Sequence, residues 1–187
     1  MELGIEHVLT VPGSPATALV DELGRAGALI EDALNEKAAA ELAFGRSLAG
    51  QATAVIVKGN GALLAAEPLQ NAGPHGIGAP LLLIVGDDVT SASSTVPTDA
   101  RPLGPLLVLP VFDLGPGELQ RATIAAAIDA SLSTRRPVVL RFTAAMAVDR
   151  DAPVTSAPAT APTDPEARTL ATPEDPFHLS KFSRFVE

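Results

Sequence analysis

Short apolar runs alternate along this chain with longer stretches rich in Ala and Leu, and this alternation constrains the fold more than any other feature. The short runs have the near-continuous apolar content of strands that are buried on both faces, and the longer stretches have helical spacing. A chain of this kind folds into a parallel sheet covered by crossover helices. The sequence therefore predicts an α/β fold, with three layers, αβα, around a parallel sheet of about six strands.

The boundaries of the elements follow from the same pattern. The predicted strands span residues 7–11, 28–30 or a little beyond, 53–57, 80–85, 106–111 and 137–142. The predicted helices span residues 15–25, 36–48, 62–71 and 117–133. The first helix has a visible start, because Ser14 can cap it and Pro15 suits a first turn that needs no amide hydrogen.

The chain changes character after about residue 148, where Pro residues begin to punctuate an Ala- and Thr-rich background. We assign residues 1–150 to one domain and residues 151–176 to an extended linker. Residues 177–187 form a tail that contains three of the six Phe residues in the chain. This tail can dock on a partner subunit, fold back on its own domain or stay disordered, and docking is the interpretation that we favour.

Composition narrows the classes of function. Hydrophobic residues make up 47% of the chain, which favours a folded domain. With 22 acidic and 13 basic residues the formal net charge is −9, so neither nucleic acid nor a membrane is an expected partner. The absence of Cys excludes iron–sulfur clusters held by this chain, and the three scattered His residues do not predict a metal site. We expect a cytoplasmic protein, because the longest apolar run is too short to cross a bilayer.

Loops that follow the strands are the places to search for a site, because ligands bind at the carboxyl ends of parallel strands. The first such loop contains Pro12, Gly13 and Ser14, which present a hydroxyl and backbone amides. The second contains Asn35 and Glu36, with Glu36 in the first turn of a helix. Read alone, the first loop is a strand-to-helix turn and Glu36 is a capping charge.

Two further loops carry polar residues. The run Lys58-Gly59-Asn60-Gly61 matches neither a Walker A loop nor a dinucleotide fingerprint, so it is only a weak indicator of phosphate binding. Asp87 and Asp88 follow the fourth strand. They lack further ligands at a suitable spacing for a metal, and we interpret them as solvated loop charges.

Taken together and in this order, the four loops resemble the pyrimidine-binding domain of thiamine diphosphate enzymes, over residues 4–150. The turn at residues 12–14 resembles that of benzoylformate decarboxylase. Asn35-Glu36, followed by Gly45, resembles the family element whose Glu contacts the aminopyrimidine ring. Closer to the indolepyruvate ferredoxin oxidoreductase branch are residues 58–61, 67–72, 86–88 and 99–101.

The resemblance implies that the chain binds thiamine diphosphate together with a partner subunit. Glu36 would hydrogen-bond a ring nitrogen of the aminopyrimidine and so activate the cofactor for attack on a 2-oxo acid. Burial beside Ala and Phe side chains would raise the pKa of the Glu36 carboxyl and keep it protonated, the form that can donate this bond. The residues implied to contact the cofactor are Pro12, Gly13, Glu36, Gly59, Asn60 and Gly61.

Four other residues receive roles by the same resemblance or by their position. Ser14 matches a hydroxyl that contacts substrate, and Lys58 falls where benzoylformate decarboxylase has a catalytic His, so Lys58 is a catalytic candidate or a cation that steers a substrate carboxylate. His75 is a candidate acid or base in the same cleft, with a simple turn residue as the alternative. Arg101 is a candidate contact for a substrate carboxylate or for another subunit.

Half of the cofactor site is missing from the sequence. In the family, a Gly-Asp-Gly motif and a later Asn hold magnesium and the diphosphate, whereas no Asn follows residues 86–88 here. The resemblance therefore implies that a diphosphate-binding β subunit holds Mg²⁺, in an α2β2 heterotetramer. Few residues precede the first strand, so the N-terminal edge of the domain is expected to be incomplete.

The favoured reaction is decarboxylation of a 2-oxo acid, with release of an aldehyde or acyl transfer. One alternative is the pyrimidine-domain subunit of an indolepyruvate-type ferredoxin oxidoreductase, in which a partner would supply the iron–sulfur clusters that a chain without Cys cannot hold. An alternative of another class is a scaffold or regulatory subunit without catalytic activity.

Overall fold

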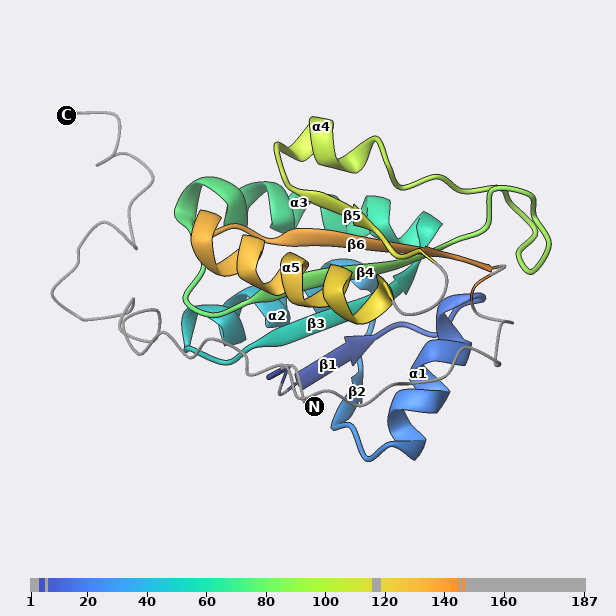
Figure 1. The fold of residues 1–187 in the computed structure, drawn as a ribbon, viewed down its shortest axis with the longest axis horizontal. Helices are drawn as coiled ribbons and strands as arrows, with labels where there is room; N and C mark the ends of the chain where they lie inside the picture. Colours follow the sequence, from blue (N-terminus) through green and yellow to red (C-terminus); the bar gives the residue numbers. More distant parts are fainter. Residues whose placement is uncertain (1–3, 6, 116–118, 145, 147–187) are drawn as a thin grey trace, which may run out of the picture.

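A computed structural model describes residues 4–5, 7–115, 119–144 and 146 of the chain (Figure 1). Across these residues the strands form one parallel sheet in the order β2-β1-β3-β4-β6-β5. The strands are β1 (His7–Thr10), β2 (Ile30–Asp32), β3 (Thr53–Lys58), β4 (Leu81–Asp87), β5 (Val111–Asp113) and β6 (Val138–Thr143). This confirms the predicted α/β class and the parallel sheet.

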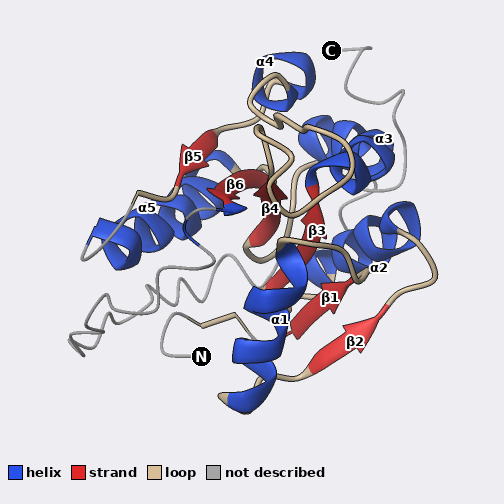
Figure 2. Cartoon of the chain, turned by 90° about the vertical axis from the view of Figure 1, so that its right-hand side faces the viewer, coloured by secondary structure: helices blue, strands red, loops and turns tan. Residues whose placement is uncertain are grey.

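Helices cover both faces of the sheet, which gives the three predicted layers (Figure 2). The helices are α1 (Ala16–Arg25), α2 (Glu36–Leu48), α3 (Gly59–His75), α4 (Leu103–Leu107) and α5 (Leu119–Thr134). One core lies under α2, α3 and α4, and the opposite face packs against α5 and α1. In such a sheet the loops meet in two places, at the carboxyl ends and at the amino ends of the parallel strands. We call these two places the carboxyl edge and the amino edge of the sheet.

The central strands β3 and β4 explain why the apolar runs are so continuous. Val55 and Val57 point into the core under α2 and α3, whereas Ala54 and Ile56 point to the other face. Because side chains alternate between the faces of a strand and both faces are covered here, apolar residues are needed on both faces, as at positions 54–57. β3 is buried from Thr53 to Val57.

One predicted strand is wrong. The segment predicted as a strand over 106–111 begins inside helix α4, and β5 starts only at Val111. Leu103 and Leu107 are both buried, as the i, i+4 spacing of a helix requires. A short apolar run fits a strand or a helix equally well, so periodicity alone did not decide between them.

The predicted cap of the first helix is also wrong. Pro15 is the residue that precedes α1, and no side chain caps this helix. The predicted linker at 151–176 and the tail at 177–187 lie outside the described residues. Within the described part of the chain, no helix combines the length and the apolar character needed to span a membrane.

Candidate functional site

The predicted site residues gather mainly at the carboxyl edge of the sheet. Because β1, β3 and β4 are parallel neighbours, the segments that follow them emerge side by side. The turn after β1 is held by two reciprocal bonds between Gly13 and Thr17. The Gly13 N–H donates to Thr17 Oγ1 at 3.0 Å, and the Thr17 N–H donates to the Gly13 carbonyl at 3.1 Å. This fixes the turn in which Ser14 is exposed.

Glu36 stands at the start of α2, directly after the residue that caps the helix. Asn35 Oδ1 accepts a hydrogen bond from the Ala38 N–H at 2.9 Å. The half-buried Glu36 side chain lies against Gly61 of α3, and a Cβ atom on Gly61 would be 2.3 Å from Glu36 Oε1. Only glycine at position 61 leaves room for this carboxyl, so α2 and α3 together determine where it lies.

Lys58 lies next to the turn after β1. It is half-buried at the residue that precedes α3, and a Cβ atom on Gly13 would be 2.8 Å from Lys58 Cδ. No ion-pair or hydrogen-bond partner for its ammonium group is found within the described ranges. The structure therefore brings Lys58 and the turn at residues 12–14 together, and leaves the cation available.

The start of α3 is also in close contact with the loop that follows β4. A Cβ atom on Gly59 would be 2.3 Å from Thr98 Oγ1 and 2.6 Å from Asp87 Oδ1. Gly59 is buried and Asn60 is half-buried. The run 58–61 thus begins a helix whose first turn is in contact on one side with Glu36 and on the other with Asp87.

The interpretation of Asp87 and Asp88 as solvated charges is wrong, because their side chains are 0% and 1% exposed. Asp88 accepts hydrogen bonds from the backbone N–H groups of residues 92, 93 and 94, at 2.6 to 2.8 Å. Burial acts to raise the pKa of Asp88, but these donors outweigh it and the pKa is lowered. The buried Asp88 carboxylate therefore stabilises the loop that follows it.

Asp87 has a different partner, Arg141 of β6, which sequence analysis missed. Asp87 Oδ2 accepts from Arg141 Nε and, at 2.7 Å, from the Ala100 N–H. Arg141 is only 7% exposed and also donates from Nη1 to Asp113 Oδ1 at 2.7 Å. The available signal was a charged residue in the middle of an apolar strand, which a buried site tolerates only with a partner.

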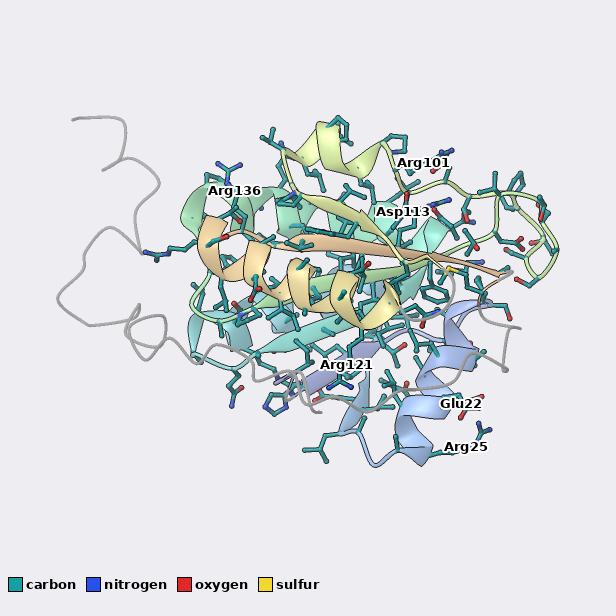
Figure 3. The ribbon with its side chains drawn as sticks, viewed as in Figure 1. Glu22, Arg25, Arg101, Asp113, Arg121 and Arg136 are labelled. Atoms are coloured by element: carbon teal, nitrogen blue, oxygen red, sulfur yellow. The ribbon has the colours of Figure 1, made fainter. Side chains whose placement is uncertain are left out.

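Arg101 lies at the same end of the molecule as Asp113 (Figure 3). Its guanidinium forms an ion pair with the Asp99 carboxylate, in which Nε donates a hydrogen bond to Oδ1 at 2.8 Å. Hydrogen bonding to Arg101 is the main cause that lowers the pKa of Asp99 to about 2. The candidate contact for a substrate carboxylate is therefore already engaged by a carboxylate of its own loop.

His75 is not brought to this edge, and its predicted place in the cleft with Glu36 is corrected. It is the last of the 17 residues of α3. A helix rises 1.5 Å per residue, so His75 lies about 24 Å from Gly59. Because α3 returns from the carboxyl edge of β3 to the amino edge of β4, its C-terminus is at the opposite edge from Glu36.

These features define an open parallel αβα domain in which the predicted site residues, apart from His75, lie at the carboxyl edge of the sheet. The half-buried Glu36 carboxyl and the backbone polar groups of the neighbouring glycine turns are groups of the kind that can hydrogen-bond an aminopyrimidine. Among the described residues, no three His, Asp or Glu side chains form a group that could hold a metal ion.

Comparison with known proteins identifies the family of this domain. Residues 1–101 match the model of the family described as thiamine pyrophosphate enzyme, N-terminal TPP binding domain. The chain belongs to this family. The predicted membership is thereby confirmed.

Two curated relatives are subunits named indolepyruvate oxidoreductase subunit IorA. The one from Archaeoglobus fulgidus is 32% identical over 151 residues, which cover 75% of this chain and 24% of the relative. The one from Pyrococcus abyssi is 29% identical over 138 residues, which cover 71% of this chain and 21% of the relative. The chain thus spans about a quarter of the length of these relatives. They fit the predicted oxidoreductase alternative better than the favoured decarboxylation.

A solved structure supports the fold. It is a 2-oxoglutarate:ferredoxin oxidoreductase from Magnetococcus marinus, with a TM-score of 0.58 and 20% sequence identity. The match covers 78% of this chain and 27% of that chain. At this identity the likeness concerns the arrangement of strands and helices alone.

Proposed function

We propose that this chain is the pyrimidine-binding component of a thiamine diphosphate enzyme that oxidises a 2-oxo acid of the indolepyruvate type and passes the electrons to ferredoxin. Family membership and the names of the relatives support this proposal. The observation that carries it is the Glu36 carboxyl, which lies against Gly61 at the open carboxyl edge of the sheet.

Some residues of this edge bind the cofactor and others contact the substrate. When bound, thiamine diphosphate supplies a nucleophilic carbon and a sink for the electrons of the 2-oxo acid. Glu36 holds the aminopyrimidine ring and exchanges a proton with its ring nitrogen. The turn at residues 12–14 and the run at 59–61 provide backbone walls for the ring. Lys58, which has no ion-pair partner in the described part of the chain, attracts the substrate carboxylate, and Ser14 contacts the substrate.

The open side of the site is the surface for a partner. Leu34, two residues before Glu36, is 92% exposed, and Leu63 and Leu64, just after Gly61, are 68% and 57% exposed. Apolar side chains grouped beside a polar site are typical of an interface. We assign them to a diphosphate-binding subunit that holds Mg²⁺ and completes the site, in an α2β2 assembly. Iron–sulfur clusters would also come from a partner, because this chain has no Cys.

The proposal is tested with the complex reconstituted from this chain and a diphosphate-binding subunit. A panel of 2-oxo acids is assayed for reduction of ferredoxin and, separately, for release of aldehyde. The oxidoreductase proposal predicts acceptor reduction that depends on thiamine diphosphate. Aldehyde release without acceptor reduction would favour the decarboxylase or carboligase instead, and absence of turnover in an intact complex would favour a scaffold subunit.

The role of Glu36 is tested by Glu36→Gln. We expect turnover to fall by about 10²–10⁴-fold, the usual contribution of a positioned acid or base. Glu41→Gln is the matched control, because Glu41 is an exposed residue of the same helix that pairs only weakly with Lys37, at 3.5 Å. Unchanged turnover in Glu36→Gln, with the complex assembled, would refute the role of Glu36.

A further inference from the structure

The Asp87 carboxyl presents an unusual asymmetry between its two oxygens. Oδ2 accepts hydrogen bonds from Arg141 and from the Ala100 N–H. Oδ1 is equally buried, yet no hydrogen-bond donor reaches it within the described residues. A buried carboxylate oxygen without a donor costs stability, so its position needs a physical reason.

That oxygen faces the beginning of α3. It lies 2.6 Å from the position that a Cβ atom of Gly59 would take. The N-terminus of a helix carries partial positive charge, which favours a carboxylate there even without a direct hydrogen bond. Thr98, whose Oγ1 accepts a hydrogen bond from the Asp88 N–H at 3.1 Å, contacts the same point. The loop after β4 therefore packs against Gly59.

Arg141 holds the Asp87 carboxylate in position for this contact. Its guanidinium is bound on one side by Asp87 and on the other by Asp113, and it lies on a buried strand paired in register with β4. Arg141 also neutralises the charge that Asp87 would otherwise carry alone into the core. The pair is rigid because β4 and β6, which carry its two members, lie side by side in the sheet.

The first turn of α3 transmits this contact to the proposed catalytic acid. Gly61, two residues after Gly59, is the residue against which Glu36 lies. A shift of Gly59 would shift Gly61 and change the space open to the Glu36 carboxyl. We propose that Asp87, fixed by Arg141, is a positioning residue that sets the first turn of α3 and, through Gly61, the place of the Glu36 carboxyl. The effect on turnover rests on the proposed function, whereas the effect on local structure does not.

The local effect is measured in the full chain with Asp87→Asn, which keeps the shape of the side chain and removes its charge. Asp113→Asn is the matched control, since it removes a second carboxylate partner of Arg141, one that is not among the nearest neighbours of Gly59. Hydrogen exchange is followed at the amides of residues 63–66, whose helical acceptors are the carbonyls of residues 59–62.

We expect exchange at these amides to be about tenfold faster in Asp87→Asn and within about twofold of the wild type in Asp113→Asn. Exchange at residues 45–48 of α2 should not change in either variant. Equal exchange in wild type and Asp87→Asn would overturn the proposal. So would an acceleration shared by both variants or spread over the whole chain, because that would mean a general loss of stability.

The link to Glu36 is measured by a double-mutant cycle in the reconstituted complex. If Asp87 acts through Glu36, Asp87→Asn should lower kcat about tenfold in the wild-type background and less than about twofold in Glu36→Gln. Additive losses would overturn action through Glu36. If Glu36→Gln itself has no effect, the proposed function fails, and the exchange measurement still decides whether Asp87 positions the helix.

Discussion

The two edges of the sheet treat their polar groups in opposite ways. At the amino edge, Ser47 Oγ donates to the Ala79 carbonyl and accepts from the Ala79 N–H. Ser131 Oγ, also buried, accepts from the Leu81 N–H at 3.1 Å and donates to the Arg136 carbonyl at 3.0 Å. Both of these serine hydroxyls have a donor and an acceptor, which is what stability alone requires.

At the carboxyl edge some groups, such as Asp88, are fully paired, but three others are held in place and left incompletely paired. Within the described part of the chain, Asp87 Oδ1 has no donor, and no hydrogen-bond partner is found for the side chain of Glu36 or of Lys58. Figure 3 shows Arg101 and Asp113 toward this end and Arg136 toward the other. Incompletely paired groups cost some stability, and under the proposed function they are the groups that bind, so the proposal predicts that function and stability are divided between the two ends of the same helices.

The largest effect is expected at the amino edge, for Gly78→Ala. A Cβ atom on Gly78 would be 2.5 Å from the Ser47 carbonyl oxygen and 3.0 Å from that of Leu48. Both are backbone atoms, which cannot move without displacing the end of α2. We expect a loss of about 3 kcal/mol in the free energy of unfolding, measured with urea.

Gly45→Ala is the matched control for that variant. Gly45 is an exposed residue within α2, and nothing lies within 4 Å of the position its Cβ atom would take. Alanine should therefore raise stability there by up to about 1 kcal/mol, from helix propensity alone. Equal losses in the two variants would show that the close packing at Gly78 is not what stabilises this edge.

The next effect is expected at the carboxyl edge, for Gly61→Ala. The added Cβ atom would overlap the Glu36 side chain, which can rotate away, so stability should change by less than about 1 kcal/mol. Turnover of the reconstituted complex should fall about 100-fold, because Glu36 would leave its place. Gly73→Ala is the control on the same helix, since its nearest neighbour would be Leu109 Cδ2 at an ordinary 3.9 Å. Full activity in Gly61→Ala would break the assignment of function to this edge.

The sequence predicts the fold well because burial on both faces leaves a local signal. The strand at residues 53–57 and the helix at residues 36–48 lie where the apolar pattern places them. The failure at α4 has a physical reason, since a run of five residues shows less than two helical turns and fits either period. Boundaries set by a cap also fail where proline rather than serine precedes the helix.

The site is harder to predict, because its contacts join distant parts of the chain. Glu36 follows from a motif, but its contact with Gly61 depends on how α2 and α3 pack. The pair of Asp87 and Arg141 is separated by 54 residues and is created by the neighbouring positions of β4 and β6. His75 was misplaced for the converse reason, since it is close to Lys58 in sequence but a full helix separates them.

A smaller effect is expected at the amino edge for Ser131→Ala. The substitution leaves the Leu81 N–H and the Arg136 carbonyl without their hydroxyl partner. We expect a loss of about 1–2 kcal/mol in urea unfolding, with turnover unchanged. Ser133→Ala is the control, because Ser133 is exposed and makes only a long bond, 3.4 Å, to the Ala130 carbonyl. A selective loss of turnover in Ser131→Ala would contradict the division between the edges.

The smallest effect concerns the ion pair of Asp99 and Arg101 at the carboxyl edge. The pKa of Asp99 is lowered to about 2 in the folded chain, from an ordinary value of 3.8, mainly by hydrogen bonds from Arg101. A lowered pKa means that the pair stabilises the fold above pH 3.8 and that this contribution disappears as the pH falls toward 2. Since the side chain of Arg101 is 59% exposed and that of Asp99 is 34% exposed, solvent screens the pair and the contribution should be below about 1 kcal/mol.

The substitution Arg101→Gln tests whether Arg101 is what lowers the pKa of Asp99, because it removes the charge but keeps an amide that can reach Asp99. The midpoint of Asp99, followed by carboxyl carbon NMR, should move up toward 3.8, while Asp88, whose pKa is lowered by backbone donors instead, should keep its midpoint. Arg25→Gln, which breaks an exposed pair with Glu22 on α1, is the control and should move neither midpoint (Figure 3). If Asp88 moved together with Asp99, the loop after β4 would be held by its surface charges. An unmoved Asp88 would mean that the backbone donors of residues 92–94, and not the surface pair, keep its pKa low.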